Sequence, residues 1–285
     1  MMSAKSSMRK IVPLIAVLGA ALLSGCSWFN SDKPISQGDN DIAYKERAIH
    51  QIYKDAWKQV YNGDWEDAAK QFAEVERQHP YSVWARRASL MSAFSYYEAN
   101  KYTEAVYACE QYISLHPGSK DVSYAFYLKA VSLYEQIVDV QRDQEKTENA
   151  LVALQDVVQR FPDTEYARDA TLKIDLTYDH LAGKEMEVGR YYLRAGDYIG
   201  AINRFRMVVI QYQKTSQVAE ALERLTEAYY ALGIDKEAVT AAAVLGYNYP
   251  GSPWYEDAYK LLQARSEKPV EDKNSWISKA FGKKS

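Results

Sequence analysis

The feature that most constrains this chain is an alanine that recurs twelve residues before a proline. The spacing occurs four times, and a fifth copy carries glutamine in place of the proline. The five pairs are Ala68 and Pro80, Ala105 and Pro117, Ala150 and Pro162, Ala201 and Gln213, and Ala238 and Pro250. Successive alanines lie 37, 45, 51 and 37 residues apart. Periods of this length are typical of stacked-repeat proteins, so we expect a linear array of similar units.

Other positions recur at fixed offsets from the same alanine. Five residues before it stand residues that accept a positive φ and can end a helix, namely Gly63, Asn100, Gly196 and Gly233. Two residues after the proline, or after its glutamine substitute, stands a hydroxyl that can cap the next helix, namely Ser82, Ser119, Thr164, Thr215 and Ser252. Each unit is therefore expected to form a helix, a tight turn, a second helix through the alanine and a stop.

The pattern resembles the tetratricopeptide repeat, in which a small residue and a proline are also twelve residues apart. It predicts an all-α fold, a right-handed α-solenoid of about five tetratricopeptide-type helix pairs, stabilised by stacking of neighbouring units. Two units are irregular. In the third, we expect a first helix from Tyr124 and then an inserted loop, VDVQRDQEKTEN, at 138–149. In the fourth, residues 168–192 are expected to form one long or broken helix.

The N-terminus has the features of a bacterial lipoprotein signal peptide. Residues 1–10 are polar and basic, and the apolar stretch 11–23 is shorter than the roughly 20 residues that a spanning helix needs. It ends in Leu23-Ser24-Gly25-Cys26, which resembles a lipobox. The resemblance implies cleavage before Cys26, an S-diacylglycerol and an N-acyl chain on that residue, and work in the periplasm. An ordinary signal peptide that leaves Cys26 unmodified is the alternative.

Four segments are therefore expected. Residues 1–25 form the signal peptide, 26–43 the lipidated N-terminus and tether, 44–265 the five-unit repeat domain, and 266–285 a polar, mobile tail. One short apolar cluster, made of Trp276, Ile277 and Phe281, is excepted from this expectation.

Composition narrows the possible functions. A hydrophobic fraction of 47% with 26% charged residues is typical of a folded protein, and 13 Gly and 8 Pro are too few for an all-β fold. Without residues 1–25 the chain has 32 basic and 38 acidic residues, a net charge of −6. Nucleic-acid binding needs phosphate-neutralising cations, so this balance argues against it.

The residues that could perform catalysis do not form a recognisable site. His79 and His116 stand before equivalent prolines, which is typical of a repeat consensus, and His50 and His180 are isolated. Metal-ligand, nucleotide-binding and nucleophile-elbow motifs are absent from the sequence. Cys109 replaces an aromatic core position of the repeat and is expected to be buried. We therefore predict no catalytic residue, metal or cofactor; a hydrolase using His50 or His180 lacks supporting residues.

The chain is rich in tyrosine, with 24 Tyr and 6 Trp against 7 Phe. In tetratricopeptide repeats the first helix of each pair lines the concave surface. The offsets that point into this surface correspond here to Tyr53, Trp57, Tyr61, Phe94, Tyr97, Tyr124, Tyr127 and Tyr134. Such a surface suits an extended, aromatic-rich peptide. Packing of the same rings between helices is the alternative for each residue.

Residues 44–262 resemble the BamD family, lipoproteins of the outer-membrane β-barrel assembly machine. The matching segments are DWEDAAKQF, YSVWARRASLMSAFSYYEANKY, QRDQEKTENA, FPDTEYARDA and LAGKEMEVGRYYLRAGDYIGAINRF. The resemblance implies a lipid anchor on the periplasmic face of the outer membrane, beside other lipoproteins of the same complex. It implies that C-terminal repeats bind a POTRA domain of a BamA-type protein, with Asn203 and Arg204 in the contact. N-terminal repeats would receive C-terminal segments of unfolded barrel proteins.

A second class of function is compatible with a lipobox and helical repeats. The chain could organise peptidoglycan- or pilus-associated machinery of the cell envelope without handling barrel proteins. The repeats alone do not separate the two classes, because both need a membrane-held binding scaffold.

Overall fold

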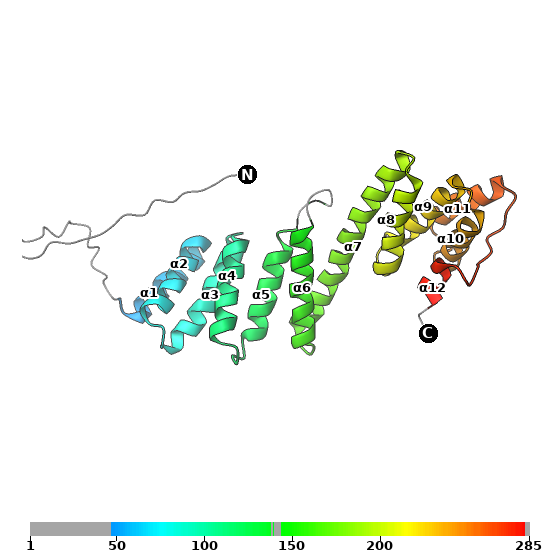
Figure 1. Ribbon diagram of the computed structural model, residues 1–285. Coiled ribbons are helices and arrows are strands. Elements are labelled where there is room, and N and C mark those ends of the chain that lie inside the picture. The colour runs from blue at the N-terminus through cyan, green and yellow to red at the C-terminus, as the bar shows by residue number, and fades with distance from the viewer. Residues whose placement is uncertain (1–46, 138, 140–143, 283–285) are drawn as a thin grey trace, which may run out of the picture. The chain divides into compact units, whose positions relative to one another are not determined.

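The computed structural model describes residues 47–137, 139 and 144–282 (Figure 1). These residues form twelve helices and no strand: α1 (Ile49–Asn62), α2 (Trp65–Gln78), α3 (Val83–Glu98), α4 (Tyr102–Leu115), α5 (Val122–Tyr134), α6 (Glu145–Arg160), α7 (Glu165–Arg194), α8 (Tyr198–Gln211), α9 (Val218–Ala231), α10 (Asp235–Asn248), α11 (Pro253–Ala264) and α12 (Trp276–Gly282). From α1 to α10 each helix packs mainly against the helices before and after it in the chain. The predicted all-α repeat fold is confirmed.

The predicted turns and close helix contacts are present. Gly63, Gly196 and Gly233 have φ values of 80°, 78° and 72°, and Asn100 has φ 57°, so all four take the left-handed conformation between paired helices. The alanines that recur once in each unit are completely buried: Ala68, Ala105, Ala150, Ala201 and Ala238. A larger side chain at these positions would push the paired helices apart.

The predicted caps are confirmed in part. Ser82, Thr164 and Ser252 accept a hydrogen bond from a backbone N–H in the first turn of α3, α7 and α11. Ser119 does not cap the first turn of α5. Its Oγ accepts a hydrogen bond from the N–H of Asp121, the residue that precedes this helix. Thr215 was wrongly predicted to be a cap. Its hydroxyl donates to the Tyr212 carbonyl, and α9 begins only at Val218.

The third unit differs from the prediction at its insert. Helix α5 begins at Val122, two residues before the predicted start, and α6 begins at Glu145. Residues 145–149, predicted as part of a loop, are therefore helical. Glu145 and Glu148 favour this early start because acidic side chains stabilise the first turn of a helix. Thr147, which is almost fully buried, also ties this turn to the core.

The fourth unit contains α7, a continuous helix of 30 residues. Of the two predicted alternatives, a long helix or a broken one, the structure has the long helix. Gly189 lies within it because α8 comes very close at this point. A Cβ atom there would lie 2.4 Å from Cε1 of Phe205, well inside contact distance. Although α7 is long, neither it nor any other helix in the described part of the chain has the apolar length needed to cross a bilayer.

The prediction of a mobile C-terminal tail was wrong for residues 266–282, which we call the C-terminal strap. The strap runs back across the last two units, and Ile277 is completely buried in the core that α8, α9 and α10 share. Nε1 of Trp276 donates to the hydroxyl of Tyr229 at 2.9 Å, and the Gln213 side chain donates to the Ala280 carbonyl at 2.9 Å. The apolar cluster noted in the sequence therefore anchors the whole segment.

Candidate functional site

A sizeable hollow lies in the N-terminal units. It has a volume of about 720 Å³, and α1, α3 and α5, together with the loop before α5, line it. Its aromatic lining consists of Tyr53, Trp57, Trp84, Phe94 and Tyr124, and its charged lining of Arg86, Arg87, Lys120 and Asp121. We call it the aromatic cavity. Its size falls within the range of ordinary ligand sites.

The rings of the aromatic cavity are held by one another and by a buried phenylalanine. Tyr53 lies 5.0 Å from Trp84 between ring centroids, and it meets Phe72 edge to face at 5.6 Å. Trp57 meets the same Phe72 at 5.9 Å with the ring planes 88° apart. Since Phe72 is completely buried, the rings above it form a fixed, half-exposed apolar floor.

The rim of the aromatic cavity is positively charged. Arg86, Arg87 and Lys120 stand against a single carboxylate, Asp121. In the described part of the chain none of the three cations takes part in an ion pair. Unpaired cations beside an apolar floor favour a ligand that combines aromatic groups with negative charge.

The structure brings together four of the eight aromatic residues predicted to form a groove: Tyr53, Trp57, Phe94 and Tyr124. Tyr97, Tyr127 and Tyr134 instead pack against the cores between helices. Tyr61 lies outside the cavity and is 84% exposed. For Tyr97, Tyr127 and Tyr134 these contacts agree with the alternative of packing between helices, whereas Tyr61 is exposed and its ring lies 6.1 Å from that of Trp57.

Two of the packed tyrosines have clear structural contacts. The hydroxyl of Tyr127 donates to Oδ2 of Asp169 at 2.7 Å, and its ring stacks on Tyr166 at 5.1 Å. Burial and this hydrogen bond raise the pKa of Tyr127. Lys173 lies over the ring of Tyr134, 5.7 Å from its centroid. These contacts join α5 to α7.

Sequence reasoning found Phe94 of α3 but missed the residues that the first turn of this helix contributes to the cavity. Trp84, Arg86 and Arg87 come within five residues of the capping Ser82, in the segment WARR. An aromatic residue followed by two arginines at the start of a repeat was the available signal. It was overlooked because the repeat offsets point to later positions of the same helix.

A second candidate surface lies where α7 turns into α8. Asn203 and Arg204 of α8 line a hollow of about 380 Å³ with Tyr192 and Asp197. Nη1 of Arg204 donates to Oε2 of Glu185 at 3.1 Å, and 39% of the arginine side chain remains exposed. The exposed residues Tyr191 and Ile199 stand next to this turn in the chain. We call these residues the α7–α8 surface.

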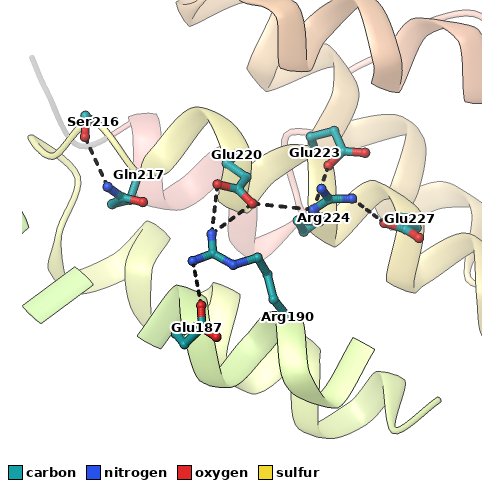
Figure 2. Close-up of polar contacts among 8 residues, drawn as sticks. All are labelled: Glu187, Arg190, Ser216, Gln217, Glu220, Glu223, Arg224 and Glu227. Carbon is teal, nitrogen blue, oxygen red and sulfur yellow. Dashed lines mark hydrogen bonds and ion pairs between the residues drawn. The ribbon is translucent and has the colours of Figure 1, made fainter. Parts of the chain in front are cut away.

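Ion pairs between side chains of α7 and α9 form a network in the last units (Figure 2). Arg190 of α7 contacts both carboxylate oxygens of Glu220 on α9 at 3.1 Å, and it also contacts Glu187. Arg224 of α9 lies between Glu220, Glu223 and Glu227. The network therefore spans two neighbouring units.

Three of the four histidines and Cys109 make contacts typical of structural residues. Nε2 of His79 lies 2.8 Å from the Arg47 carbonyl, and the rings of His116 and His50 pack against Tyr112 and Trp84. Cys109 is completely buried, and burial raises the pKa of its thiol to about 12. Over the described residues, three potential metal ligands nowhere come together. Cys26 and the predicted segments 1–25 and 26–43 lie outside the described residues.

Comparison with known proteins gives consistent matches. A family model described as YfiO, outer membrane lipoprotein, matches residues 45–245. A Caulobacter vibrioides protein named outer membrane protein assembly factor BamD is 49% identical, over 92% of this chain and 84% of its own length. The protein of the same name from Rickettsia prowazekii is 41% identical, over 89% and 97%. The solved structure of PilW, a type IV pilus biogenesis factor, is 16% identical with a TM-score of 0.33, over 74% and 98%, a likeness too weak to support any conclusion.

Proposed function

Since this chain belongs to the BamD family of outer-membrane lipoproteins and acts in outer-membrane protein assembly, we propose that it is a scaffold holding two partners. Its N-terminal units bind C-terminal segments of unfolded barrel proteins. Its C-terminal units bind a POTRA domain of a BamA-type insertase, beside other lipoproteins of the complex. The chain is a non-enzymatic assembly factor, held by lipid on Cys26 at the periplasmic face of the membrane.

The observation that carries the first half of this proposal is the aromatic cavity. Its floor offers ring edges and faces to a guest aromatic side chain. Its rim of Arg86, Arg87 and Lys120 attracts a carboxylate, and an arginine can hold one through two parallel hydrogen bonds. A barrel-type C-terminal segment that ends in an aromatic residue carries both groups at one end.

The α7–α8 surface supports the second half. Glu185 holds one end of the Arg204 guanidinium, which leaves its exposed N–H groups in a fixed direction. Exposed Tyr191 and Ile199 nearby provide the apolar contact area that accompanies a charged group in an interface. An acidic side chain on a POTRA domain would complement this arrangement.

Crosslinking tests the cavity. A photoreactive residue placed at Tyr53 or Trp57 is expected to crosslink to a peptide with a barrel-type C-terminal strand. Amidation of the peptide's terminal carboxylate is expected to weaken the crosslink. The control site is Tyr247, an exposed tyrosine on α10. Equal crosslinking at Tyr247 and Tyr53, or none at either cavity position, would contradict the proposal and favour an envelope scaffold that does not handle barrel proteins.

Charge reversal tests the α7–α8 surface. Arg204→Glu is expected to weaken binding of a POTRA fragment by about 1–3 kcal/mol, because repulsion is added to the lost bond. The control is Arg168→Glu, an exposed arginine in the first turns of α7. The measurement is the Kd of the mature chain in detergent by calorimetry. An unchanged Kd would remove Arg204 from the contact.

A further inference from the structure

One carboxylate of the ion network is deeply buried. Glu223, on α9, is only 4% exposed, and its Oε2 atom accepts no hydrogen bond from any residue that the structure describes. The helix also carries Leu222 and Leu225, which are completely buried in the core shared with α8 and α10. A buried carboxylate is normally stabilised by paired hydrogen bonds or a dedicated cation.

Within the described part of the chain, Arg224 is the one cation paired with Glu223, and it is shared with other carboxylates. Nε of Arg224 lies 3.3 Å from Oε2 of Glu223 and 3.6 Å from Glu220, and Nη1 lies 3.0 Å from Glu227 (Figure 2). The same guanidinium stands 5.5 Å from the ring centroid of Trp254 on α11. Arg224 therefore connects the carboxylates of α9 with α11.

The positive and negative charges around Arg224 do not balance. The network contains Arg190 and Arg224 against Glu187, Glu220, Glu223 and Glu227, which leaves two negative charges in excess when all are ionised. Helix α11 adds Asp257, which is paired with its own Lys260 at 2.7 Å. Among the four network carboxylates, Glu223 has the most buried side chain. A proton on Glu223 removes one excess charge where solvation is poorest.

We propose that Glu223 is a proton-binding site that makes the packing of α11 against α9 depend on pH. With the proton bound, the carboxyl of Glu223 is neutral, and the Arg224 guanidinium pairs with Glu220 and Glu227 alone. Without it, a buried negative charge faces Glu220, Glu227 and Asp257, and the contact between the two helices is weakened.

The pKa of Glu223 supports this geometry. Burial raises it from 4.5 to about 7, with Glu227, Asp257 and Glu220 adding to the rise and Arg224 opposing it. The folded chain therefore holds this proton more tightly than the unfolded chain does. The stability from this site is complete below about pH 4.5 and is lost as pH rises to about 7.

The test compares the mature chain in detergent with its Glu223→Gln variant, because glutamine imitates the protonated acid. The two melting temperatures are expected to be nearly equal at about pH 4, where the carboxyl is protonated in the folded and the unfolded chain alike. At about pH 8.5 the variant is expected to melt roughly 3–6 °C higher. Glu256→Gln, an exposed position in the first turn of α11, is the control whose difference from the parent chain stays the same at both pH values.

A second measurement does not depend on unfolding. The infrared spectrum at about pH 6 is expected to contain a protonated-carboxyl band that Glu223→Gln removes and Glu256→Gln retains. A melting difference that is the same at both pH values would overturn the proposal. So would a band that survives in Glu223→Gln.

Discussion

At the scale of single residues, Cys109 shows how the repeat assigns a role to a side chain. It occupies the position that Phe72 and Phe205 take in other units, and all three are completely buried. A reactive cysteine needs a thiolate, which positive charge and exposure favour. Cys109 has the opposite surroundings, because burial raises its thiol pKa to about 12. It is a small core residue and not a nucleophile.

This burial gives a test of the lipid anchor. The mature chain has two cysteines, Cys26 and Cys109. If Cys26 is acylated, the folded chain purified from membranes is expected to show no fast-reacting thiol at about pH 8, since Cys109 would react about 1000-fold more slowly than an ordinary cysteine. Denaturant should expose one thiol, which Cys109→Ala removes. A fast thiol in the folded chain would mean that Cys26 is unmodified.

At the scale of elements, the helix starts depend on local hydrogen bonds that equivalent residues do not always make. Thr164 and Thr215 occupy the same repeat position, and each donates its hydroxyl to the carbonyl three residues earlier at 2.7 Å. Only Thr164 also accepts from a helix N–H, that of Ala167 at 3.2 Å. Helix α9 begins too late for Thr215 to reach its first turn. The spacing from turn to helix therefore decides which hydroxyl is a cap.

Comparing Thr164 with Thr215 isolates the contribution of the Thr164 cap to stability. Thr164→Ala is expected to lower the free energy of unfolding by about 1 kcal/mol more than Thr215→Ala does. Both variants lose the bond to the preceding carbonyl, so the difference reports the N–H bond to α7. Urea unfolding of the two variants measures it. Equal losses would show that the bond to Ala167 contributes nothing to stability.

At the scale of the whole repeat domain, the last unit is covered by the C-terminal strap. Stacked repeats expose an apolar face at each end, and terminal units need a cover. The strap provides it by burying Ile277 and by placing Trp276 under Arg206, whose guanidinium lies 5.0 Å from the ring centroid. The strap lies beyond residue 245, where the family model ends.

Two strap positions make a matched pair. Ile277→Ala is expected to lower the melting temperature by roughly 4–15 °C, because it leaves a cavity worth about 2–5 kcal/mol in the core of the last units. Val270→Ala, in the same strap at a position 66% exposed, is expected to have almost no effect. Circular dichroism during heating compares them. Similar melting temperatures for both variants would mean that the strap does not stabilise the array.

The sequence by itself determined the helix pairs of this protein. A buried alanine, a residue of positive φ and a stop act within one unit, so their spacing predicts each hairpin without knowledge of the rest. Only the tertiary structure decided the strap and the aromatic cavity. Trp276 meets Tyr229 across 47 residues, and the cavity joins α1, α3 and α5. Such contacts depend on how units stack, which no local pattern specifies, and this is why only four of the eight predicted groove residues line the aromatic cavity.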